Sequence, residues 1–79
     1  MEKELQKYYE ARFDLFASQG WKDLTEDLQS MVENYSEIGK INTVEELYIR
    51  KGQLDILNWL LGLKEISEQA YEELNAEDI

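Results

Sequence analysis

The run ILNWLLGL at positions 56–63 constrains the fold of this chain more than any other feature. Six of its eight residues are large and apolar, although the chain carries a formal net charge of -10. On a helix these positions point in nearly every direction, whereas the apolar residues of a surface helix follow one stripe. The run must therefore be enclosed by other helices, from the same chain or from a partner. Contact between helices is the first property to explain.

Composition indicates a small helical protein. The 79 residues suffice for one domain, of a size where a single core contributes little net stability and oligomerisation often supplies the rest. A hydrophobic fraction of 43% with 11% aromatic residues is too high for a disordered chain. The absence of proline permits long helices throughout. We therefore predict one all-α domain over residues 1–79.

Two residue types that often carry chemistry are absent. Without cysteine there is no disulfide framework and no thiolate metal site, which fits an intracellular protein. Without histidine the commonest general base and transition-metal ligand is missing. Acids that share a helix face, such as Glu65, Glu68 and Glu72, are expected to be solvated rather than to form a metal site or a catalytic pair. We predict no catalytic residue, no cofactor and no metal, and so no enzyme.

The charge balance also excludes classes of partner. Eighteen acidic residues against eight basic ones argue against direct binding of nucleic acid or of an anionic membrane surface. The longest apolar run is far shorter than the roughly 20 residues of a membrane span. The N-terminus lacks the basic-then-apolar pattern of a signal peptide. We expect a chain that is not secreted and that recognises protein rather than membrane, nucleic acid or a small-molecule substrate.

Hydrophobic spacing predicts three helices. The first spans about 2–18, and Gly20 is expected to end it in a left-handed conformation. The second spans about 21–38 and is ended by Gly39. Its apolar positions are spaced 3-4-3-4-3, typical of a helix that packs lengthwise on another; they are Trp21, Leu24, Leu28, Met31, Tyr35 and Ile38.

The third predicted helix is the longest. Thr43 and Glu46 match a capping box, so the helix should begin there and continue to about residue 74, through Gly52 and Gly62. Residues 75–79 are expected to form an acidic tail.

Two architectures fit these three helices, about 2–18, 21–38 and 43–74. One is a three-helix bundle in which the first helix folds back over the other two; it is favoured because the apolar phase slips near Gly20. The other is an antiparallel helical hairpin with a broken first arm and a turn near residue 41. In the hairpin Gly20 and Gly62 lie at matching levels, and Trp21 and Trp59 are near neighbours.

The basic spot at Arg50 and Lys51, just before the apolar run, allows two interpretations. Both residues can pair with acids four positions away along the helix, Glu46 and Asp55. Alternatively Arg50 anchors a carboxylate of a partner, while a neighbouring glycine, Gly52, lets another backbone approach. Within the run, Asn58 either faces solvent or is buried and fixes the helix register.

Several segments together resemble small acidic helical proteins of tailed bacteriophages, which are usually without an assigned activity and are often encoded near virion-structure genes. The segments are YYEARF at 8–13, QGWKDL at 19–24, RKGQL at 50–54, LNWLL at 57–61 and AYEEL at 70–74. The resemblance implies a non-enzymatic part or accessory of a phage particle, located in the host cytoplasm or in the virion. It carries no catalytic residue.

We therefore expect a protein–protein interaction module, oligomeric or embedded in a larger assembly, that acts by packing of helix faces. Tyrosines can bury a ring while the hydroxyl stays wet, so they are expected at the edge of the contact. A partner is expected on the side of Gly52 and Gly62. The alternative is an acidic DNA-mimic inhibitor of a host nucleic-acid enzyme. The predicted partner-binding residues are Tyr48, Arg50, Leu54, Leu57, Trp59 and Leu61.

Overall fold

The computed structural model describes residues 1–77, and within that range the chain is entirely helical apart from its connections. The all-α prediction is confirmed. The elements are α1 (Lys3–Ala17), α2 (Gln19–Tyr35), a short 3-10 helix η1 (Ile38–Lys40), α3 (Val44–Leu61) and α4 (Leu63–Glu77). Of the predicted tail, residues 75–77 belong to α4, and residues 78–79 lie outside the described part of the chain.

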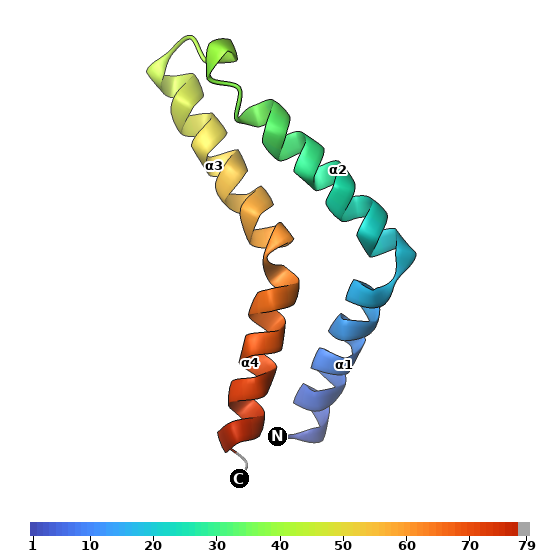
Figure 1. Ribbon diagram of the computed structural model, residues 1–79. Coiled ribbons are helices and arrows are strands. Elements are labelled where there is room, and N and C mark those ends of the chain that lie inside the picture. The colour runs from blue at the N-terminus through green and yellow to red at the C-terminus, as the bar shows by residue number, and fades with distance from the viewer. Residues whose placement is uncertain (78–79) are drawn as a thin grey trace.

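The helices form an antiparallel hairpin with two long arms. The first arm is α1 followed by α2, and the second is α3 followed by α4, with the start of α1 beside the end of α4 at the open end (Figure 1). Helix α2 packs against α3 and α1 against α4, whereas within the described residues the backbones of α1 and α3 do not approach each other closely. Of the two predicted architectures the structure therefore has the hairpin, and the preference for a first helix folded back over the other two is wrong.

The first arm breaks at Ser18, close to where the apolar phase predicts it. Ser18 has extended backbone angles, and its Oγ accepts a hydrogen bond from the Trp21 N–H (3.2 Å) while donating to the Leu15 carbonyl (2.6 Å). One side chain thus caps the end of α1 and the start of α2. Gly20 lies inside the first turn of α2 with a negative φ, so its predicted role as a left-handed terminator is wrong.

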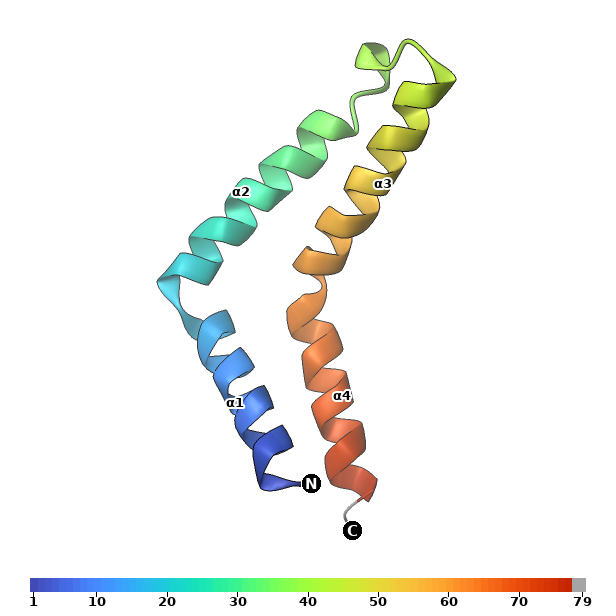
Figure 2. The same ribbon diagram turned by 180° about the vertical axis from the view of Figure 1, so that it is seen from behind.

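The second arm bends at Gly62, at the same level as the break in the first (Figures 1 and 2). Helical hydrogen bonds continue across the bend, because the Gly62 N–H donates to the Asn58 carbonyl and the Ile66 N–H donates to the Gly62 carbonyl, both at 3.0 Å. The single helix predicted over 43–74 is therefore two helices joined at a glycine. The matched levels of Gly20 and Gly62 are confirmed, because Trp21 and Lys22 of the first arm line one hollow with Leu61 and Lys64 of the second.

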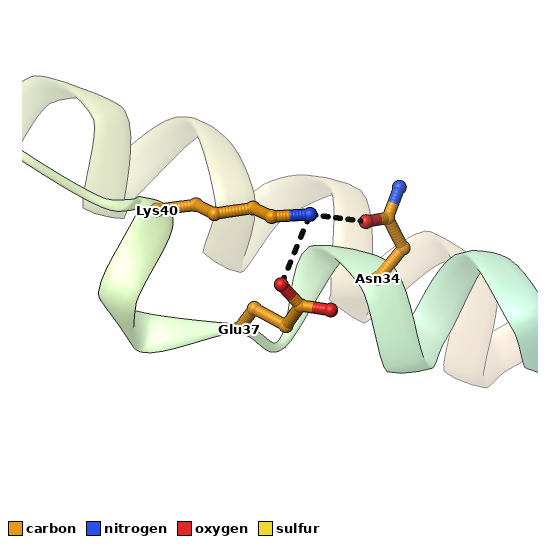
Figure 3. A network of polar contacts seen from close by, with 3 residues as sticks. All are labelled: Asn34, Glu37 and Lys40. Atoms are coloured by element: carbon orange, nitrogen blue, oxygen red, sulfur yellow. Dashed lines mark hydrogen bonds and ion pairs between the residues drawn. The ribbon is translucent and has the colours of Figure 1, made fainter.

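The tip of the hairpin is ordered by polar contacts. The predicted capping box is present: the Thr43 Oγ1 accepts from the Glu46 N–H (3.1 Å), while the Glu46 carboxylate accepts from the Asn42 N–H (2.8 Å), one residue before the cap. On the other side of the turn the Lys40 ammonium donates to the Asn34 side chain (3.2 Å) and pairs with Glu37 at 3.0 Å (Figure 3). These contacts fix the connection between α2 and α3. Helix α2 ends at Tyr35, so the predicted end at residue 38 before Gly39 is wrong; both residues lie in η1.

The hairpin is one layer of helices with a thin core. Its principal extents are 53 × 27 × 16 Å and its radius of gyration is 16.8 Å, where a compact domain of this length would have about 12 Å. Among the described residues the buried hydrophobic side chains are Phe16, Leu28 and Leu57. Each helix thus meets another across one face only. The apolar run at 56–63, which needs neighbours on several sides, is covered on one.

Candidate interaction surface

The inner face of α3 is occupied within the chain. Leu57 is buried, with 7% of its surface exposed, and Leu54 and Leu61 are half-buried beside residues of α2. Three of the predicted partner-binding residues therefore form the seam between the arms. Because these side chains are in contact with α2, a partner would have to separate the arms to reach them.

Arg50 also faces the first arm. Its guanidinium carbon lies 4.7 Å from the centre of the Tyr35 ring, and its Nη1 donates to the Gln53 side chain (3.3 Å). Such cation–π stacking stabilises a partly exposed site by about 0.5–1 kcal/mol. The expected pairing four residues apart is present for Lys51 with Asp55 (3.1 Å), whereas Arg50 stacks on Tyr35 in place of pairing with Glu46.

The outer face of α3 is apolar and exposed to solvent. Trp59 is 53% exposed and Ile56 61% exposed, and Asn58, also exposed, takes the solvent-facing alternative. The apolar positions on this face follow the spacing 3-4-3-4-3 of a helix seam and continue past the bend into α4. We call this set the outer stripe; it comprises Ile49, Gly52, Ile56, Trp59, Leu63 and Ile66.

A hollow lies beside the outer stripe, between α2 and α3. Gly52 forms part of its wall, and a methyl group placed on Gly52 would meet nothing within 4 Å. The hollow is open and almost entirely apolar; it is lined by Met31, Tyr35, Gly52, Gln53, Ile56 and Leu57. The predicted open side near Gly52 is therefore a concave apolar surface.

The tyrosines expected at the edge of a contact divide between two environments. Tyr9 and Tyr71 pack edge to face across α1 and α4, with ring centroids 5.7 Å apart, and so belong to the contact between the arms. Tyr8 and Tyr48 are exposed, and Tyr48 lies at the tip next to Ile38, which is 82% exposed. Trp21 packs against Phe16 at 5.0 Å, and within residues 1–77 no ring contact joins it to Trp59.

Charged side chains gather at a hollow between α1 and α4, where Lys64, Glu68 and Glu72 lie beside Tyr71. In the described part of the chain no group of three or more acids is arranged to hold a metal ion. Glu65, Glu68 and Glu72 are exposed on α4, as expected for a solvated helix face. No helix within residues 1–77 is both long enough and apolar enough to cross a membrane.

Comparison of the chain with models of known protein families, with curated proteins and with solved structures found no match.

The sequence contains a signal for the outer stripe that residue-by-residue inspection of the apolar run misses. Inside the run, Leu57 and Leu61 face inward, while Ile56 and Trp59 face outward. The outward pair belongs to a heptad-like series that begins at Ile49, seven residues before the run. The spacing of the apolar residues from 49 to 66 distinguishes the inward face of the helix from its outward face. Within 56–63 alone, inward and outward residues form one continuous apolar run.

Proposed function

We propose that the chain is a non-enzymatic protein–protein interaction module that acts by packing the outer stripe against another helix surface. The observation that carries this proposal is the bare heptad-spaced face of α3, in a chain with only three buried hydrophobic side chains among its described residues. Monomeric proteins rarely expose contiguous apolar patches larger than a few hundred Å² unless the patch serves an interaction. Partner contact also supplies stability that so thin a core lacks.

The setting we propose is a tailed-bacteriophage particle, as a virion structural component or an assembly accessory in the host cytoplasm. The support for this setting is the resemblance of the sequence to small acidic phage proteins. A rod-like hairpin with one apolar outer face suits a role in which helices pack side by side in an assembly.

Site-specific photo-crosslinking in the cells that naturally make the chain tests the proposal. A photoreactive phenylalanine analogue at Ile56, on the outer stripe, should give protein adducts on illumination. The same analogue at Leu24, an exposed apolar residue on α2, is the matched control and should give few. Equal adduct yields at the two positions, or none at Ile56, would contradict the proposal.

A third position tests the alternative of an acidic DNA-mimic inhibitor. Gln69 is exposed on α4 among the glutamates that would imitate phosphates, so that alternative predicts adducts to a nucleic-acid enzyme at Gln69 and none at Ile56. The phage setting makes a further demand: the chain should co-purify with particles of the phage that encodes it, and Ile56→Glu should reduce its copy number there. Unchanged copy number in the variant particles would contradict a role of the stripe in assembly.

A further inference from the structure

The outer stripe is complementary to itself. Trp59 has its largest side chain and Gly52 has none, and the two are seven residues apart on one helix face. Seven residues are about two turns, or about 10.5 Å along the axis, with Ile56 close to the midpoint. A two-fold axis through that midpoint, perpendicular to α3, exchanges the positions of Trp59 and Gly52 on an antiparallel partner helix.

Nothing inside the chain requires a glycine at position 52. The space around it is open, its φ is negative, and glycine within a helix costs about 0.5–1 kcal/mol relative to alanine. The absent side chain leaves room for an indole ring from another chain. Such a ring could lie flat on the exposed backbone at Gly52 and enter the hollow formed with Met31 and Gln53.

The surface area points to a partner of substantial size. The chain exposes 6180 Å², whereas a compact monomer of its 9.4 kDa mass would expose about 5,000 Å². The excess of about 1,200 Å² exceeds the roughly 800 Å² that each partner buries in a stable interface of standard size. A pairing along the outer stripe would remove part of this excess, because Ile49, Ile56 and Trp59 are each more than half exposed.

We propose that a second copy of this chain covers the outer stripe, with the two α3 helices antiparallel about a two-fold axis near Ile56. Trp59 of each copy packs over Gly52 of the other, and Ile49 of each lies opposite Leu63 of the other. This inference rests on the proposed function and names its partner.

Electrostatics gives the pairing a characteristic salt dependence. Each copy carries a net charge of -10, so two copies repel one another at long range. Salt screens that repulsion over about 10 Å at 0.1 M ionic strength, so added salt should strengthen self-association. Binding to a basic partner would weaken with salt instead.

The first experiment measures molar mass by sedimentation equilibrium from low micromolar to about 100 µM protein. We expect twice the 9.4 kDa chain mass, increasingly so at higher salt. Ile56→Glu and Trp59→Ala should both give the single-chain mass with unchanged helicity, since both side chains are largely exposed in the hairpin. A wild-type chain that stays at the single mass throughout, or a dimer that survives both substitutions, would overturn the proposal.

A matched pair of glycine substitutions isolates the Trp59 contact. A methyl group meets nothing within 4 Å at Gly52 or at Gly20, so alanine is tolerated in the hairpin at both positions. Gly52→Ala should weaken dimerisation about tenfold, because it overfills the contact with the tryptophan. Gly20→Ala should leave the dimer unchanged. Equal dimer affinity of the two variants would refute the placement of Trp59 over Gly52.

Single cysteines, introduced into a chain that has none, report the direction of the helices. On oxidation Ile56→Cys should form a disulfide with itself across the two-fold axis. Ile49→Cys and Leu63→Cys should crosslink with each other when mixed and poorly with themselves. Efficient self-crosslinking at 49 and at 63 would indicate a parallel pair and refute the antiparallel one.

The results of these experiments can contradict the second copy as partner without contradicting the proposed function. A single-chain mass in solution removes the second copy as the partner, and adducts to another protein at Ile56 would then still support an interaction module. Absence of adducts at Ile56 in the cell would contradict both the proposed function and the second copy as partner.

Discussion

The thinness of the core makes the cost of truncating Leu57 a sharp test of the hairpin. Leu57→Ala removes three carbon groups from a side chain that is 7% exposed. At about 0.8 kcal/mol for each buried group the lost transfer free energy is about 2.4 kcal/mol, and the cavity left between α2 and α3 raises the total to about 3 kcal/mol. For a domain of this size that is a large part of the whole free energy of unfolding.

Leu47→Ala is the matched control, because it is the same substitution in the same helix at a residue that is 51% exposed. About half of the transfer term applies and no enclosed cavity forms, so we expect about 1 kcal/mol. Urea unfolding followed by circular dichroism at 222 nm measures both values, with all samples at one protein concentration because association adds to apparent stability. Equal losses for the two variants would refute the assignment of Leu57 to the seam and Leu47 to the surface.

Three further predictions concern single polar contacts and use the same unfolding assay. Ser18→Ala should lower the free energy of unfolding by about 1 kcal/mol, because it removes the cap shared by α1 and α2; an unchanged value would show that the break does not depend on the hydroxyl. Thr43→Ala should cost about 1 kcal/mol, whereas Glu46→Gln, which keeps an acceptor for the Asn42 N–H, should cost much less. Arg50→Gln should cost about 0.5–1 kcal/mol through loss of stacking on Tyr35, and Arg50→Lys should retain part of it; a larger loss for the lysine variant would argue against the stack.

Local signals in the sequence predict much of the fold. The capping box at Thr43 and the phase slip near Ser18 are each encoded within a few residues, and each is present in the structure. The identity of the residue at the break is harder to predict. Glycine is the usual terminator in the left-handed conformation, but here a serine hydroxyl satisfies the backbone groups of both helix ends, and no left-handed residue is needed.

Long-range arrangement is where the sequence is ambiguous. The 3-4-3 spacing of the second helix predicts a seam, and Leu28 is indeed buried in it, but Leu24 and Met31 lie at its exposed edge. The spacing of apolar residues identifies one face of the helix but not the rotation of that face about the helix axis. In the structure Thr25 and Val32 are more buried than Leu24 and Met31. The same limit applies to the apolar run, where inward and outward residues are neighbours in sequence. A one-layer hairpin and a three-helix bundle satisfy the same local rules, and only packing distinguishes them.

The coincidence of the two bends divides the hairpin into two stacked helix pairs. Helices α2 and α3 form the pair at the tip, α1 and α4 form the pair at the open end, and within the described residues no close backbone approach links α1 to α3 or α2 to α4. The tip pair closes a short loop, whereas the open-end pair must bring together segments from opposite ends of the chain, which costs more entropy and is slower. We expect the hairpin to fold progressively from the tip toward the open end. Amide hydrogen exchange should therefore be fastest at the open end. The outer stripe lies mainly on the helix pair that forms first. Two chains could therefore associate along α3 before α1 packs against α4.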